Sequence, residues 1–148
     1  MNSKFEKNFP NLIDINTFRH WTAVSLRFSD QDSLGHINNV AYAAYVEQAR
    51  VALFDKIARP KDNKIDYILA NLQIDYRREM HFPGNVDVGA CLLKIGTKSI
   101  TTGYGLFKDD KTIATASCIN VFFDTTTRAS IAIPDNLRRD LESELAKN

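Results

Sequence analysis

A short polar stretch in the first third of the chain carries the side chains best suited to chemistry. Its members are Asp30, Asp32, Gly35, His36, Asn38 and Asn39. The residues that follow, 39–58, have apolar side chains on nearly every side at the helical period, which predicts a helix enclosed by the rest of the fold. The start of such a helix offers free backbone N–H groups and partial positive charge. We therefore expect a site that stabilises negative charge where the loop meets the helix.

Four residues of this stretch have separate expected roles. Asn38 suits the N-cap of the helix, and the backbone N–H of Asn39 is the candidate donor to an oxyanion. Gly35 has the torsional freedom to turn the loop and bring the Asp32 carboxylate back toward that donor. Asp32, when ionised, can act as a general base or as a nucleophile. The alternative is that Asp32 only accepts hydrogen bonds from turn N–H groups, and its polar neighbours favour the chemical role.

Other candidate reactive groups are expected to be structural. Asp30 is predicted to shape the loop, and His36 to hold the loop or line the site rather than serve as the general base. Cys91 and Cys118 lie in apolar alternating segments, so buried thiols are expected and a disulfide framework is not. Neither the cysteines nor the histidines have metal-ligand spacing, and no metal site is predicted.

The predicted helix also carries polar side chains whose roles follow from their spacing. Tyr42 and Tyr45 are expected in the core, with their hydroxyl groups reaching a polar rim. Glu47 and Arg50 are three residues apart on the flank of the helix and are expected to form an i,i+3 ion pair.

Period-two patterns predict strands in the rest of the chain, over residues 21–28, 68–76, 86–95, 99–108 and 111–124. Short connections between the later strands make them antiparallel neighbours. The pattern of residues 134–146 predicts an amphipathic helix packed on the outside of the domain. Residues 1–18 are expected to form an N-terminal arm. The expected result is one domain over residues 1–148, of the α+β class, with a curved antiparallel sheet wrapped around a long central helix.

Composition narrows the classes of partner. With 19 Lys and Arg against 18 Asp and Glu, the net charge of +1 provides no broad field for nucleic acid or an anionic membrane. The start of the chain lacks a signal peptide, and no run approaches the ~20 apolar residues of a membrane span, so a cytoplasmic protein is expected. A single sheet around one helix leaves an exposed edge strand, which predicts pairing of two subunits.

Three motifs together resemble those of a known family. They are Asp30-x-Asp32, then Gly35-His36-Ile37-Asn38-Asn39, then Tyr42-x-x-Tyr45-x-Glu47-x-Ala49-Arg50. This pattern is similar to that of the hotdog-fold acyl-CoA thioesterases, in particular the 4-hydroxybenzoyl-CoA thioesterase-like family. The resemblance covers about residues 20 to 130 and implies the hotdog fold.

The resemblance implies hydrolysis of an acyl-CoA to a carboxylic acid and coenzyme A. The expected catalytic set is Asp32, Asn39, Gly35 and His36. In the family the aspartate that matches Asp32 either attacks the thioester to form a mixed anhydride or activates water, and the N–H that matches Asn39 polarises the carbonyl. Sites of the family lie where subunits meet, which implies a homodimer or homotetramer. No cofactor is implied, because coenzyme A is part of the substrate.

The same resemblance suggests residues that bind the substrate. Thr97, Lys98 and Ser99 match a turn at which relatives contact coenzyme A, whose phosphates need basic partners. Arg77 and Arg78 are further candidates for the phosphates. Asn38 and Tyr42 complete the expected substrate-binding set.

Three alternatives to acyl-CoA hydrolysis remain on this fold. An acyl carrier protein thioesterase would use the same chemistry on a different carrier. A non-catalytic hotdog protein would bind or shuttle acyl-CoA without turnover. Hydration or dehydration of enoyl thioesters needs a histidine placed with an acid in a different motif, and the spacing of His36 after Asp32 does not clearly supply it.

Overall fold

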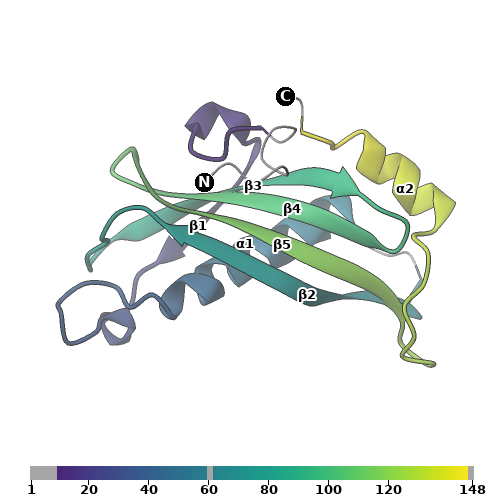
Figure 1. Cartoon of the computed structure of the whole chain (residues 1–148), viewed down its shortest axis with the longest axis horizontal. Helices are drawn as coiled ribbons and strands as arrows, with labels where there is room; N and C mark the ends of the chain where they lie inside the picture. The colour runs from purple at the N-terminus through teal and green to yellow at the C-terminus, as the bar shows by residue number, and fades with distance from the viewer. Residues whose placement is uncertain (1–9, 60–61, 147–148) are drawn as a thin grey trace.

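A curved five-stranded sheet lies against one long helix, in a computed structural model that describes residues 10–59 and 62–146 (Figure 1). All neighbouring strands are antiparallel, and their order across the sheet is β1-β3-β4-β5-β2. The elements are β1 (His20–Ser25), α1 (Ala41–Ile57), β2 (Ile65–Tyr76), β3 (Asn85–Ile95), β4 (Ser99–Lys108), β5 (Lys111–Asp124) and α2 (Asp135–Glu142). The predicted hotdog fold is confirmed.

Helix α1 forms the core with the inner face of the sheet. Its buried side chains recur at helical spacing and are Tyr42, Tyr45, Val46, Ala49, Leu53, Phe54 and Ile57. The helix begins two residues later than predicted, because the Ala41 N–H donates to the Asn38 carbonyl (3.0 Å) in a preceding turn. The predicted N-cap is wrong: the cap position is Val40, whose backbone is already helical (φ −64°, ψ −31°). The Asn38 side chain lies 3.4 Å from the Val40 N–H.

Strand β1 ends three residues earlier than predicted. After Ser25 the chain turns, and residues Phe28–Asp30 form a 3₁₀ turn. The Phe28 side chain is 76% exposed, although the alternating pattern assigned it to the buried face. The cause is local, since the Arg27 backbone and side chain both donate to the Asp30 carboxylate and pull the chain out of the extended form.

Edge strand β2 contains a β-bulge that changes which face its side chains occupy. The pairing with β5 shifts between Leu69 and Asn71, so Ala70 is an extra residue. Tyr67, before the bulge, and Leu72, after it, both face the core. A regular strand would place Ile68 on the buried face, but Ile68 is exposed.

The outer face of the sheet is covered in part by the chain ends. Phe18 of the N-terminal arm packs over Gly89 and Gly105, where an added Cβ would lie within 2.7 Å of its ring. Helix α2, in contrast, buries Leu137 and Leu141 in the core that contains α1, and it ends at Glu142, earlier than predicted. Residues 1–9 of the predicted arm lie outside the described residues. No helix in the described residues is long and apolar enough to cross a membrane.

Candidate active site

The loop between β1 and α1 closes on itself through backbone hydrogen bonds. The Asp32 N–H donates to the His36 carbonyl (3.0 Å), and the Asn38 N–H donates to the Asp30 carbonyl (2.8 Å). Gly35 lies at the tip with φ +85°, a conformation that side-chain-bearing residues rarely adopt. This agrees with the turning role predicted for Gly35.

Asp32 is held inside this loop and is not extended into solvent. Its Oδ1 accepts the Leu34 N–H at 2.9 Å, and its Oδ2 lies 3.3 Å from His36 Nε2. Only 23% of the side chain is exposed. Both the turn role and the chemical role foreseen for Asp32 are therefore compatible with its contacts, because Oδ2 has no backbone partner among the described residues.

His36 lies between two carboxylates. Its Nδ1 is 3.4 Å from Glu79 Oε1, on the opposite side of the ring from Asp32. His81 approaches the second oxygen of Glu79 (3.6 Å), and its Nδ1 lies 3.1 Å from the Gly35 carbonyl. The ring thus orients Asp32, as its expected structural role requires, and two residues outside the loop orient the ring.

The Asn39 N–H is free at the N-terminal end of α1. No carbonyl or side chain in the described part of the chain accepts it. The Asn39 carbonyl, in contrast, accepts the Tyr76 hydroxyl at 2.9 Å. The Tyr76 ring stands edge-on to buried Tyr42, 5.1 Å between centroids. Tyr76 therefore holds the peptide between Asn39 and Val40, while the N–H of the preceding peptide, that of Asn39, stays available to a ligand.

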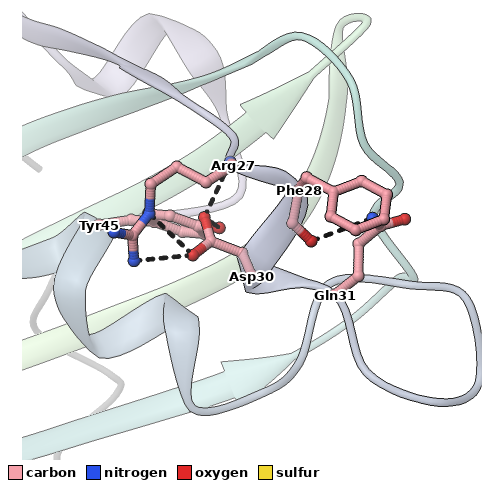
Figure 2. A network of polar contacts seen from close by, with 5 residues as sticks. All are labelled: Arg27, Phe28, Asp30, Gln31 and Tyr45. Atoms are coloured by element: carbon pink, nitrogen blue, oxygen red, sulfur yellow. Dashed lines mark hydrogen bonds and ion pairs between the residues drawn. The ribbon is translucent and has the colours of Figure 1, made fainter.

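A buried carboxylate ties the loop to the helix (Figure 2). Asp30 Oδ2 accepts the Tyr45 hydroxyl at 2.8 Å and the Arg27 N–H at 3.0 Å, and Oδ1 accepts two guanidinium N–H groups of Arg27. Burial raises the pKa of Asp30, but these hydrogen bonds outweigh burial, so the pKa lies below its ordinary value. Asp30 is therefore ionised in the folded protein and is structural, as predicted.

The two predicted groups of coenzyme A contacts lie at different ends of the molecule. Arg77 and Arg78 directly follow Tyr76 and are exposed, on the segment that leads to Glu79. Residues 97–99 follow the far end of β3, which spans roughly 35 Å at about 3.3 Å per residue. Thr97, Lys98 and Ser99 are therefore not brought to Asp32 within one protomer. There the turn packs against the segment before α2, where the Ile133 N–H donates to the Thr97 carbonyl.

A groove of about 310 Å³ lies between α1 and β2, and its lining begins at Val40, the residue after Asn39. Its lining is mostly apolar: Val40, Ala43, Ala44, Val46, Glu47, Arg50, Leu69, Leu72 and Cys118. Arg50 has no carboxylate partner in the described residues, and its Nη1 lies 3.5 Å from Oδ1 of buried Asn120. The predicted ion pair between Glu47 and Arg50 is wrong, because Arg50 turns toward the sheet.

Both cysteines are buried, as predicted. Burial raises the pKa of Cys91 to about 12 and that of Cys118 to about 11, so both thiols stay protonated near neutral pH. Among the residues that the structure describes, no group of three or more His, Cys, Asp or Glu is arranged to hold a metal ion.

Sequence reasoning missed Glu79, His81 and the hydroxyl of Tyr76 as site residues. All three belong to the end of β2 and the segment after it, and the Ile37 N–H joins that segment to the loop by donating to the Met80 carbonyl (2.8 Å). The sequence does show a cluster of polar residues before Gly84. That cluster could be assigned to the site only by knowing that β3 pairs with β1, which places the β1–α1 loop and the β2–β3 segment at the same end of the sheet.

Comparison with known proteins decides the family. The model of the thioesterase-like superfamily matches residues 26–141, which include the loop, α1 and all strands except β1. The chain belongs to the thioesterase-like superfamily. It is 25% identical over 126 residues to the long-chain acyl-CoA thioesterase FadM of Escherichia coli K12, covering 82% of this chain and 96% of FadM. It is 32% identical over 89 residues to the uncharacterized protein YsmA of Bacillus subtilis 168, covering 60% of each chain.

Solved structures share the fold of this thioesterase-like chain. The PA5185 protein of Pseudomonas aeruginosa PAO1 superposes with a TM-score of 0.78 at 23% identity, over 89% of this chain and 95% of that one. A thioesterase of Thermus thermophilus, complexed with coenzyme A and Zn, has a TM-score of 0.75 at 24% identity, over 84% and 98% of the two chains. These likenesses establish the architecture.

Proposed function

We propose that the protein hydrolyses acyl-CoA thioesters, with Asp32 as nucleophile or general base and the Asn39 N–H as donor to the carbonyl oxygen. The free Asn39 N–H carries the proposal, because an unpaired donor at a helix's positive end is what a developing oxyanion requires. One such donor typically contributes about 3 to 4 kcal/mol to transition-state stabilisation. Membership of the thioesterase-like superfamily supports the same chemistry.

Asp32 supplies the attack in this proposal. As nucleophile, its Oδ2 forms a bond to the thioester carbon, the C–S bond breaks, and the mixed anhydride is then hydrolysed. As general base, the same oxygen takes a proton from water, which attacks the carbon instead, and the C–S bond then breaks to release the coenzyme A thiolate. In both routes His36 holds Oδ2 in place, since the ring lies 3.3 Å from it.

The acyl group is placed in the groove between α1 and β2. The lining is mostly apolar, and from Val40 to Arg50 the helix rises roughly 15 Å at 1.5 Å per residue. The resemblance to FadM, a long-chain acyl-CoA thioesterase, supports an extended acyl group. Arg77 and Arg78, near the loop, are proposed to meet the phosphates of coenzyme A.

We also propose a dimer in which the partner completes the coenzyme A site. Thr97, Lys98 and Ser99 lie far from Asp32 in their own protomer, so they can serve the substrate only from a second subunit. The exposed edge of β2 and the groove beside it provide a surface for such pairing.

Release of free coenzyme A thiol tests the function. The purified protein is incubated with short, long and aromatic acyl-CoAs, and with acyl groups on acyl carrier protein. Turnover of one or more acyl-CoAs is the expected result. Preference for the carrier protein would favour the acyl carrier protein thioesterase instead. Tight binding across the panel without turnover would show a non-catalytic acyl-CoA-binding protein.

A further inference from the structure

Hydrogen bonds among Arg27, Asp30 and Tyr45 connect the loop to the helix, although none of these residues has a part in the proposed reaction. Asp30 is 5% exposed, and the Tyr45 side chain that donates to it is also buried. Tyr45 belongs to the second turn of α1, whereas Arg27 and Asp30 belong to the turn after β1. Figure 2 shows the carboxylate between the guanidinium and the hydroxyl. One carboxylate thus fixes the loop to the body of α1.

The same residue fixes the peptide that precedes the oxyanion donor. The backbone carbonyl of Asp30 accepts the Asn38 N–H at 2.8 Å. The next N–H along the chain is that of Asn39, which has no acceptor among the described residues. Because the side chain of Asp30 is anchored to α1 and its carbonyl to Asn38, the direction of the Asn39 N–H relative to the helix depends on this anchor.

We infer that Asp30 and Tyr45 are positioning residues for the reaction, an inference that rests on the proposed function. They touch no substrate, and they act by preorganising the Asn39 N–H. Preorganised donors stabilise the transition state because they need no reorientation as charge develops. Loss of the anchor should therefore reduce kcat and leave KM nearly unchanged, as expected for an interaction made only in the transition state.

Two substitutions remove the anchor to different extents. Tyr45→Phe deletes one hydroxyl, keeps the ring in the core and separates Asp30 from α1. Asp30→Asn keeps the size but places an NH₂ group among donors. Tyr67→Phe is the matched control, because Tyr67 is a partly buried tyrosine on β2 whose hydroxyl has no hydrogen-bond partner in the described residues.

The experiment combines turnover of an accepted acyl-CoA with amide hydrogen exchange. We expect kcat to fall about tenfold in Tyr45→Phe and further in Asp30→Asn, with KM within about twofold. Exchange of the Asn38 N–H should accelerate in both variants, while exchange in β3 and β4 stays slow. Tyr67→Phe should match the parent. Tyr45→Phe keeps the inference testable if Asp30→Asn fails to fold.

The outcomes separate this inference from the proposed function. An active parent whose Tyr45→Phe variant keeps kcat within twofold, or keeps Asn38 protected, overturns the positioning role and leaves the hydrolase intact. An equal loss of thermal stability and activity, with exchange accelerated throughout the sheet, also overturns it, since the network would then only support folding. A parent that turns over no thioester removes the function itself, and the inference with it.

Discussion

At the scale of single residues, the Asp32 carboxylate has two different oxygens. Oδ1 accepts the Leu34 N–H and shapes the loop, whereas Oδ2 faces the His36 ring. This division reconciles the two roles foreseen for Asp32, because one oxygen can hold the turn while the other takes part in chemistry. It also gives His36, and Glu79 behind it, the role of directing the oxygen that we propose to be reactive.

Substitution of Glu79 tests whether Glu79 acts on Asp32 through His36. Glu79→Gln should lower kcat about two- to fivefold, because partly exposed ion pairs contribute at most about 1 kcal/mol. In a His36→Gln background the same change should have no further effect, since Glu79 acts through the ring. A double-mutant cycle of kcat values measures this, with exposed Glu142→Gln as the control. Effects of Glu79 and His36 that simply multiply would show that the residues act independently.

The lowered pKa of Asp30 predicts how acid affects stability. A carboxyl group whose pKa is lower in the folded than in the unfolded state stabilises the fold above the unfolded value, about 3.9. This stabilisation is lost as the pH falls through the lower folded value. Urea midpoints measured from pH 7 down to 3 should thus fall less steeply for Asp30→Asn than for the parent, although the variant is less stable at pH 7. Parallel curves would contradict an ionised Asp30 with a lowered pKa.

Residue-level prediction succeeded where the relevant contacts are local. The turn at Gly35, the structural role of Asp30 and the free N–H of Asn39 all follow from contacts within the segment that runs from the end of β1 to the second turn of α1. Glu79 was not predicted, because it reaches His36 across more than forty residues of sequence. Such a contact depends on the pairing of β1 with β3, which periodicity does not specify.

At the scale of elements, periodicity predicted which segments are strands and which are helices. It did not predict which face of the sheet each side chain of β2 occupies. The predicted bounds of β3, β4 and β5 agree with the structure to within one residue. In β2 the alternation placed Ile68 and Leu72 on one face, and the bulge at Ala70 separates them. A bulge changes the face of every later side chain, so an alternating pattern alone does not locate it.

The outer face of the sheet yields a stability prediction. An added Cβ at Gly105 would lie 2.7 Å from the Leu12 carbonyl oxygen and 2.6 Å from the Phe107 ring. Gly105→Ala should therefore lower the free energy of unfolding by about 1 to 3 kcal/mol, as overpacking does. Chemical denaturation measures the change, and Ser117→Ala on neighbouring β5 should alter it by less than about 0.5 kcal/mol. Unchanged stability of Gly105→Ala would show that the arm does not pack on this face.

At the scale of the whole molecule, the sheet has two edge strands, β1 and β2, each with a partner on one side only in the described chain. Strand β2 has no partner on its outer side within the described chain, and Ile68 on it is 53% exposed. An edge with exposed apolar side chains favours pairing with a second copy. The turn at residues 97–99 also needs a second subunit if it is to reach a substrate held at Asp32.

A charge on this edge should separate the subunits. Ile68→Lys is expected to shift the proposed dimer toward monomer and to reduce kcat/KM, because the contribution proposed for the partner would be lost. Sedimentation equilibrium reports the mass. Ile15→Lys is the control, since Ile15 is 42% exposed but belongs to the N-terminal arm. A variant Ile68→Lys that remains a fully active dimer would place the interface elsewhere.

The central claim is that the Asp32 carboxylate either attacks the thioester or activates the water that attacks it. The most direct measurement is kcat of Asp32→Asn on the acyl-CoA that the parent hydrolyses fastest, with thermal unfolding to confirm that the variant folds. Because the change keeps the size of the side chain and removes its charge, kcat should fall by at least about 100-fold. A folded variant whose kcat stays within twofold of the parent would contradict the account.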